Sequence, residues 1–358
     1  MKIEKYNMSP EIELKLLVNQ GLINSIKQEL SHFKLIKQQQ VFSQNIYFDT
    51  QDHFFSRQKM GLRVRKENEC YTMTLKTAGK VQGGLHIRPE YNVNLSCEKP
   101  DLTLFHQYSE LQLAQDYAVL QSSLMPIFST DFQREYYVLE TGSGTQLEIA
   151  IDQGKILANQ QQAPISEIEI ELKTGSVLDV LNFVQNLLFL DGIRIGQESK
   201  AERGYQLAGL GKKSKPVLIE DWRNLLHQSF PTAHQKVVAL LDYEWRLLKY
   251  LEKVNTQVSV LDGFATIELI GLFFNLYQYY ENEPQLLAQL LMELPVSQQE
   301  IVEELQETNQ MFYQQIKQMI ARHVEQQDHT KAIQQLLEFT SRGKYLQRMI
   351  NLLKVTLK

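Results

Sequence analysis

Charged side chains recur at every second position in two short segments of the sequence. Glu11, Glu13 and Lys15 alternate with aliphatic residues in EIELK, and residues 167–172 read EIEIEL. Successive side chains of a β-strand point to opposite faces, so the charged residues of each segment share one face. Carboxylates gathered in this way repel one another unless bases or a cation lie opposite. Their oxygens suit a hard divalent cation such as Mg²⁺ or Mn²⁺.

Basic side chains show the same alternation elsewhere. Arg63 and Arg65 share a face in GLRVRKE, Lys76 ends YTMTLK, and Arg88 and Glu90 share a face in RPEY. Arginine and lysine suit phosphate oxygens. If the sheet closes with this face inward, its lumen has an acidic and a basic wall, which fits a polyphosphate with a metal ion. An antiparallel sheet with one wet face explains the same alternation, and the pattern alone leaves both interpretations open.

The elements that must position these residues follow from periodicity. Residues 1 to about 208 predict mostly short strands of period two, separated by turns such as TAGKVQGG and TGSGT. Helices are expected over 19–36 and 176–192. Numerous short strands with such turns favour a barrel or a large antiparallel sheet. His86, beside one of these turns, is predicted to pack rather than to contact a ligand.

The C-terminal part has a different period. GLGKKSKP, residues 209–216, predicts a linker. Beyond it, apolar residues at spacings of three and four predict amphipathic helices, including 232–254, 297–324 and 331–355. We therefore predict an α+β chain with a strand-rich domain over 1–208, the linker over 209–216 and an all-α helical domain over 217–358.

Composition excludes several classes. The chain has 358 residues, 43% of them hydrophobic, and a net charge of −5, which argues against a protein that coats nucleic acid. Its two cysteines lack a CxxC partner, which argues against a disulfide framework or a zinc site. The N-terminal segment lacks an apolar signal core, and the most apolar run contains Glu268 and Asn275. We expect a cytoplasmic protein without a membrane span.

Eight further segments, in this order, accompany EIELK. They are NIYFDT, GLRVR, YTMTLKTAG, GGLHIRPEYNV, PIFSTDFQREYYVLE, LEIAIDQGKI, EIEIELKTG and SKAERGYQLA. EIELK resembles the ExExK signature of the CYTH superfamily, the triphosphate tunnel metalloenzymes. The whole set, over about residues 9–209, resembles the bacterial inorganic triphosphatase branch. The resemblance implies an eight-stranded antiparallel β-barrel whose tunnel binds a triphosphate with Mg²⁺ or Mn²⁺.

The resemblance also assigns residues. The metal ligands implied by the resemblance are Glu11 and Glu13, together with carboxylates of a later strand. That strand has three acids, and we favour Glu169 and Glu171 over Glu167. The phosphate-binding bases are Lys15, Arg63, Arg65, Lys76, Arg88, Arg134, Lys200 and Arg203. Glu90, Glu148 and Glu167 take supporting roles that orient the bases. The catalytic set becomes Glu11, Glu13, Lys15 and Asp152, and Asp152 positions a water.

The expected activity is hydrolysis of tripolyphosphate to diphosphate and phosphate. On the same fold, hydrolysis of nucleoside or thiamine triphosphate, or adenylyl cyclase activity, stays an alternative. A non-catalytic polyphosphate-binding module is a third interpretation, which the complete acidic set disfavours.

The helical part resembles, by position and helicity, the CHAD domain that often follows such a barrel. Its histidines are scattered, and its acids exceed its bases by about four, so it is mildly acidic. An acidic bundle repels a polyanion. We therefore predict a divergent CHAD-like bundle that supports the barrel, a protein partner or a homo-oligomer and takes no part in the chemistry.

Overall fold

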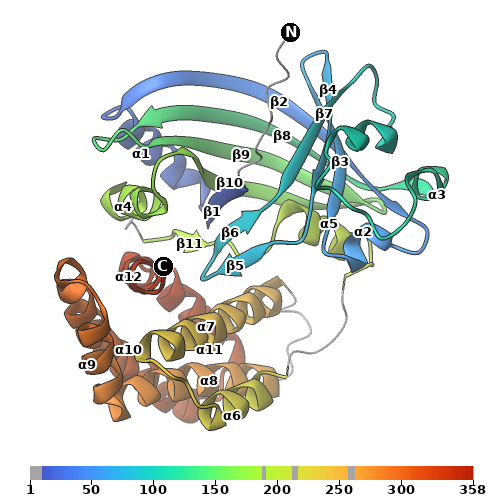
Figure 1. Ribbon diagram of the computed structural model, residues 1–358. Coiled ribbons are helices and arrows are strands. Elements are labelled where there is room, and N and C mark those ends of the chain that lie inside the picture. The colour runs from blue at the N-terminus through green and yellow to red at the C-terminus, as the bar shows by residue number, and fades with distance from the viewer. Residues whose placement is uncertain (1–9, 188–190, 212–216, 257–262, 358) are drawn as a thin grey trace. The chain divides into compact units, whose positions relative to one another are not determined.

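The computed structural model describes residues 10–187, 191–211, 217–256 and 263–357 (Figure 1). The chain divides into two compact units. The first comprises Met1–Val81, Leu85–Val180 and Glu198–Lys213. The second comprises Gln82–Gly84, Leu181–Gln197 and Ser214–Lys358, so it takes two short segments from within the strand-rich part of the sequence.

Long antiparallel strands form the framework of the first unit. In chain order they are β1 (Glu11–Leu17), β2 (Lys34–Thr50), β3 (Gly61–Glu67), β4 (Cys70–Lys76), β5 (Lys80–Gln82), β6 (Leu85–Arg88), β7 (Glu90–Leu95), β8 (Leu124–Glu140), β9 (Gln146–Ala158) and β10 (Gln161–Thr174). A two-residue strand, β11 (Arg194–Ile195), falls in the second unit.

Eight antiparallel ladders connect these strands into a circuit. The order is β6-β1-β10-β9-β8-β2-β3-β4-β7. β6 pairs with β1 and β7 pairs with β4, yet both belong to one segment interrupted only at Pro89. Proline has no N–H to donate, so a ladder breaks at this residue and the segment changes partner. With residues 85–95 taken as one broken strand, the circuit has the eight strands that the resemblance implies.

The curvature of the sheet is shown by an ion pair between β1 and β4, which flank the broken strand formed by β6 and β7. Lys76 on β4 lies 2.5 Å from Glu11 on β1 (Nζ to Oε2), although five strands separate β4 from β1 in the sheet order. Flat strands at their usual spacing would place these residues about 29 Å apart. The charged face is therefore the concave one, as the sequence pattern required for a tunnel.

Aliphatic residues occupy the opposite face. Leu14 and Leu16 on β1 and Ile168 and Ile170 on β10 are fully buried. On β3, β4 and β7, a second apolar cluster includes Leu62, Met73, Leu75 and Tyr91, and residues of short helices pack against it. These helices are α2 (Phe54–Arg57), η1 (Leu102–Gln107) and α3 (Tyr117–Ser122). Burial of alternate residues thus holds the other, charged set on the lumen side.

Two predicted helices are shorter than expected. The helix expected over 19–36 is α1 (Gln20–Leu30), because β2 begins at Lys34, which pairs with Glu140 of β8. The helix expected over 176–192 is α4 (Val177–Leu187). Residues 188–190 lie outside the described chain, and so does most of the predicted linker.

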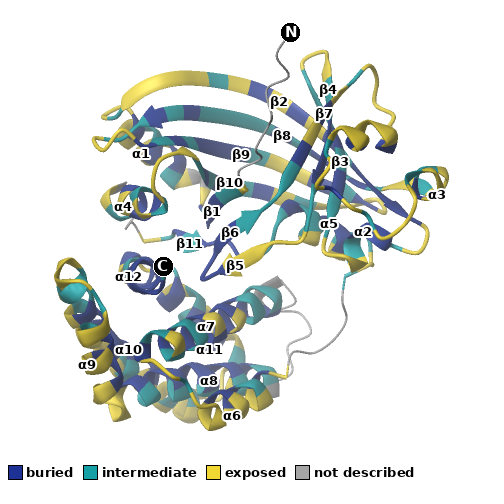
Figure 2. Cartoon of the chain, viewed as in Figure 1, coloured by how far each residue is buried: buried dark blue, intermediate teal, exposed yellow. Residues whose placement is uncertain are grey.

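The second unit is helical. It contains α6 (Leu218–His227), α7 (Ala233–Thr256), α8 (Gly263–Asn282), α9 (Pro284–Glu293), η3 (Val296–Gln298), α10 (Gln299–Gln326), α11 (His329–Thr340) and α12 (Gly343–Thr356). The predicted helix over 331–355 is thus divided into α11 and α12. α12 is buried over most of its length (Figure 2). Among the described helices, none has the length and apolarity needed to cross a bilayer.

Candidate functional site

Strand register places the lumen charges in rows. Arg134 on β8 lies opposite Asp152 on β9, which lies opposite Glu167 on β10. Lys15 on β1 lies opposite Glu169 on β10. Directly opposed residues of antiparallel strands have Cβ atoms about 5 Å apart, so each row is a set of touching side chains.

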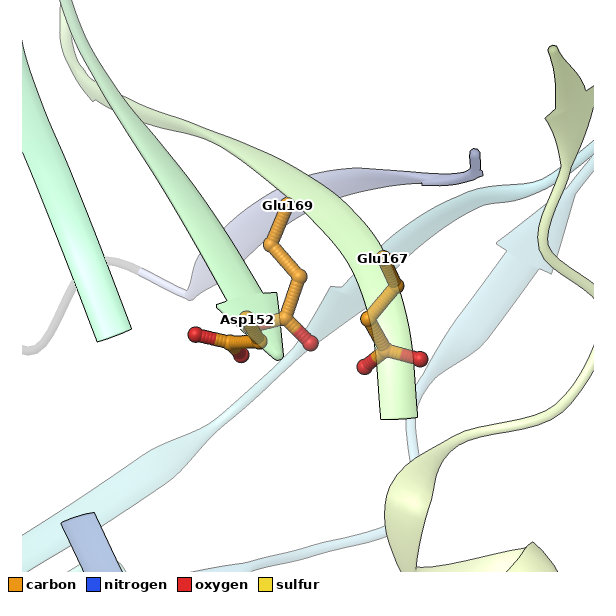
Figure 3. A group of neighbouring side chains, drawn as sticks. All are labelled: Asp152, Glu167 and Glu169. Carbon is orange, nitrogen blue, oxygen red and sulfur yellow. The ribbon is translucent and has the colours of Figure 1, made fainter. Parts of the chain in front are cut away.

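Asp152, Glu167 and Glu169 form the tightest group of carboxylates among the described residues. Their oxygens lie within 4.8 Å of one another, and Figure 3 shows them approaching from β9 and β10. Arg134 donates two hydrogen bonds to Asp152 (2.7 Å from Nε and 2.6 Å from Nη2) and a third to Glu169 (2.8 Å). Lys15 Nζ lies 3.0 Å from Glu167 and 3.2 Å from Glu169. We call Lys15, Arg134, Asp152, Glu167, Glu169 and Lys200 the ion-pair knot.

Helix α5 (Lys200–Leu207) supplies the last member of this knot. Ser199 and Glu202 form a reciprocal capping box that fixes the first turn. Gly204 faces the ring of Phe128, and a Cβ at this position would lie 2.1 Å from a ring carbon. Glycine therefore allows a close approach of helix and sheet, which brings Lys200 to the carboxylates.

Lys200 occupies the centre of the acidic group. Its Nζ lies 2.7 Å from Asp152 and 2.9 Å from Glu169, and it also contacts Glu167. Burial alone would raise the pKa of Glu169, but Lys200, Lys15 and Arg134 hold it well below its usual range. Three carboxylates and three bases make the knot formally neutral.

A second group of lumen charges is acidic, and we call it the acidic region. It contains five carboxylates and three bases: Glu11, Glu13, Glu90, Glu148, Glu171, Lys76, Arg88 and Lys173. Glu13 lies opposite Glu171 in register, and Glu171 lies opposite Glu148. With five carboxylates and three bases, the acidic region has a formal net charge of −2.

The pKa values reflect this imbalance. Burial, together with Glu13 and Glu90, raises the pKa of Glu11 to about 8, against the attraction of Lys76. Burial also raises the pKa of Glu171. Burial opposes ionisation of Glu13 as well, but Lys76 and Arg88 lower its pKa to about 2. At neutral pH, one carboxyl group of the acidic region thus keeps a proton that a cation would displace.

Arg63 and Arg65 on β3 form the basic pair of the lumen. Within the described chain, no carboxylate lies within 4.0 Å of the Arg63 guanidinium, and its buried Nε has no hydrogen-bond partner. Arg65 has one distant carboxylate, Glu67, at 3.5 Å from Nη1. Burial and the neighbouring Arg63 and Arg134 lower the pKa of Arg65 to about 10. Burial opposes the charge of Arg63, but Tyr47 and Glu90 raise its pKa. Two half-buried cations with so little counter-charge favour an anionic ligand.

All of the predicted site residues line one surface or its edge. Arg203 is peripheral, since its guanidinium lies 3.7 Å from Glu167 and also donates to the carbonyl of Pro164. Asp152 is fully buried, and both of its oxygens accept hydrogen bonds from Arg134, while its expected role in positioning a water stays a prediction. Glu169, a predicted metal ligand, is likewise engaged by three bases of the knot.

Sequence reasoning missed three residues of this surface. Lys173 continues the alternation of the β10 acids and pairs with Glu171 at 2.9 Å. Asn45 accepts a hydrogen bond from Arg65. Its alternation with Ser43 and Tyr47 could have predicted that it lies on the lumen face of its strand. His86 lies in β6 opposite Glu13, with 6% of its surface exposed, rather than at a turn.

The chain is similar to known proteins over most of its length. A model of the CYTH domain matches residues 9–205. The inorganic triphosphatase of Haemophilus influenzae is 38% identical over 355 residues, which cover 98% of each chain. A solved structure of HpAC1 from Hippeastrum, which is named for adenylyl cyclase and has a dominant triphosphatase activity, is also similar. Its sequence is 17% identical and its TM-score is 0.34, and the match covers 62% of this chain and 98% of that chain. A Bacillus halodurans protein named for adenylate cyclase is 19% identical with a TM-score of 0.32, covering 59% and 96%.

Proposed function

The chain belongs to the CYTH family, and we propose that it is a metal-dependent inorganic triphosphatase that hydrolyses tripolyphosphate to diphosphate and phosphate inside the barrel. The observation that carries the proposal is the separation of charge in one lumen. The basic pair has almost no counter-charge, whereas the acidic region has two carboxylates in excess. A polyphosphate bound together with a divalent cation would neutralise both.

The basic pair would hold the phosphate chain. Arg63 and Arg65 present guanidinium groups from one strand, and Lys76, Arg88 and Arg134 line the rest of the lumen. Bases distributed in this way hold three linked phosphates in line, which is most of what phosphoryl transfer asks of a protein. Lys15, Lys200 and Arg203 are bound by carboxylates of the knot. We therefore propose that they complete the electrostatic surface rather than make the first contacts.

The acidic region fits a hard divalent cation. We propose Glu11, Glu13 and Glu171 as its ligands, with Glu148 next to Glu171, because these oxygen donors lie in adjacent strands and carry excess negative charge. Glu169 joins them only if it leaves the knot. A bound Mg²⁺ or Mn²⁺ would neutralise phosphate charge and polarise the attacked phosphorus. The knot residues Asp152 and Glu167 orient Lys200, Lys15 and Arg134 towards the lumen.

The test is release of phosphate from tripolyphosphate, ATP and thiamine triphosphate by the full chain, with Mg²⁺, with Mn²⁺ and with a chelator. The proposal expects release from tripolyphosphate that depends on the cation and exceeds release from the other two substrates. Preference for ATP or thiamine triphosphate would favour the organic triphosphatases of the same fold. Binding without turnover under all conditions would favour a polyphosphate-binding module.

For the second unit we propose a supporting role. Its sequence is mildly acidic, and its buried centre is an ion pair between Glu244 and Arg348, both fully buried. Tyr277 and Tyr345 donate hydrogen bonds to Glu244, and Arg348 Nε donates to Asn309. These features support a divergent CHAD-like bundle that takes no part in hydrolysis.

A further inference from the structure

Asn45 on β2 is a neutral residue in a row of lumen side chains. It lies opposite Arg65 of β3 on one side and opposite Thr130 of β8 on the other. Only 1% of its surface is exposed. A buried amide at this position needs partners for its carbonyl oxygen and for its amino group, and it has both.

The partners fix the orientation of the amide. Asn45 Nδ2 donates to Ser43 Oγ (3.2 Å) and more weakly to the backbone oxygen of Thr130 (3.4 Å). Its Oδ1 accepts a hydrogen bond from Arg65 Nε (3.0 Å). Rotating the amide by half a turn would set its NH₂ group against a guanidinium that has only donors, so the carbonyl must face Arg65.

We propose that Asn45 is a positioning residue that aims the guanidinium of Arg65 at the phosphate chain without cancelling its charge; this inference rests on the proposed function. Holding Nε from the strand side leaves Nη2 of Arg65 for an anion, together with Nη1, which lies 3.5 Å from Glu67. A carboxylate in the same place would hold the guanidinium equally well but would neutralise it. The neutral amide keeps Arg65 as a buried cation with little counter-charge, which is the property that an anion site requires.

The decisive variant is Asn45→Asp, which preserves size and the acceptor oxygen and adds one negative charge beside Arg65. Gln44→Glu is the matched control, because it adds the same charge on the next residue of β2, where the side chain is exposed and points to the opposite face. Asn45→Ser is a second variant, neutral but too short to reach Arg65 Nε. Each full-length variant is assayed for kcat and KM with tripolyphosphate and Mg²⁺, for tripolyphosphate binding by calorimetry in chelator, and for its thermal midpoint.

Asn45→Asp is expected to raise KM and the dissociation constant roughly tenfold to a hundredfold, because the added negative charge would compete with the phosphate chain for Arg65 and weaken one charge-assisted hydrogen bond to it. Its kcat should fall less than threefold, and its thermal midpoint should stay close to that of the wild type. Asn45→Ser should raise KM in the same direction, and Gln44→Glu should change neither constant. A KM and dissociation constant for Asn45→Asp equal to those of Gln44→Glu would overturn the inference.

The calorimetric binding measurement distinguishes the proposed function from the proposed positioning role of Asn45. If the wild-type protein binds tripolyphosphate, the Asn45→Asp variant binds it more weakly, and neither hydrolyses it, the proposed function fails and the positioning role stands. If the wild type hydrolyses tripolyphosphate and both Asn45 variants match it, the function stands and the positioning role fails. Absence of both binding and hydrolysis by the wild type would overturn both.

Discussion

Lys76 Nζ lies 2.5 Å from Glu11 Oε2 and 2.8 Å from Glu90 Oε2, so one ammonium joins strands on both sides of the point where the barrel closes. Lys76 is the direct partner of Glu90 between β4 and β7, and Glu11 is the direct partner of Arg88 between β1 and β6, so the contact between Lys76 and Glu11 spans the segment Arg88–Glu90. This contact joins a base and an acid of the acidic region directly. Burial raises the pKa of Glu11 to about 8 in spite of this contact, which leads to the first prediction.

Binding of a divalent cation should release a proton from Glu11. With a pKa of about 8, this carboxyl group is mostly protonated at pH 7 in the cation-free protein, and a cation would favour the ionised form. Titration of Mg²⁺ or Mn²⁺ by calorimetry in buffers of different ionisation enthalpy should report release of close to one proton per ion at pH 7. Release should vanish near pH 9.5 and in Glu11→Gln. Equal release by wild type and variant at pH 7 would contradict the assignment.

Substitutions in the basic pair and in the acidic region should affect different kinetic constants. Arg65→Ala removes an uncompensated cation and should mainly raise the KM for tripolyphosphate, by tenfold or more. Glu13→Ala removes a proposed cation ligand and should abolish turnover at every Mg²⁺ concentration. Arg57→Ala is the control, since Arg57 lies exposed at the end of α2 and pairs with Asp52, which is also exposed. Wild-type turnover by Glu13→Ala would show that the acidic region has another role.

The free energy of unfolding should decrease at low pH because of the buried side chain of His86. Burial, and then Arg88, lowers the pKa of this imidazole to about 4. Since the folded pKa lies below the ordinary value, the unfolded chain takes up the proton first as the pH falls. The stabilisation is complete above about pH 6.5, declines from there and is lost as the pH falls through 4, a total of about 3 kcal/mol. Denaturant unfolding without cations should show a smaller decline for His86→Gln than for wild type.

The matching control for this measurement is His32→Gln, because the His32 side chain is 73% exposed. That substitution should leave the pH dependence of the free energy of unfolding as it is in the wild type. An identical decline in His86→Gln and wild type would mean that other groups cause the loss of stability in acid.

Gly204→Val should displace α5 and with it Lys200. The added side chain would collide with the Phe128 ring, where even a Cβ would lie 2.1 Å from a ring carbon. Overpacking of this kind costs about 1–3 kcal/mol, and withdrawal of Lys200 would leave the knot with excess negative charge. We expect a lower thermal midpoint and weaker tripolyphosphate binding. Gly142→Ala has open space around its Cβ and should change neither property.

Glu244→Gln should destabilise the helical unit. Arg348 donates two hydrogen bonds to Glu244 (2.8 and 2.7 Å), and both side chains are fully buried, so the substitution leaves a buried charge without a partner. The expected loss is about 3–5 kcal/mol in the free energy of unfolding. Glu220→Gln breaks an exposed pair with Arg223 instead and should stay within about 0.5 kcal/mol of wild type. Similar stabilities of the two variants would contradict a structural role for the buried pair.

Much of this architecture could be predicted from the sequence. Alternation at period two correctly placed Glu11, Glu13 and Lys15 on one face, because side-chain direction along a strand is a local property of the backbone. Spacings of three and four predicted the helices of the second unit for the same reason. Where a prediction ran too long, as in residues 331–355, the helical pattern continued through a turn that only packing reveals.

The tertiary structure alone decided which charges meet. Lys200 comes from a helix that follows the last long strand, yet it forms ion pairs with Asp152, Glu167 and Glu169, the tightest carboxylate cluster among the described residues. The change of partner at Pro89 and the register of β1 against β10 set Glu13 beside Glu171 and Lys76 beside Glu11. Such contacts join residues far apart in the chain. They depend on register and closure, whereas alternation reports only the face on which a side chain lies.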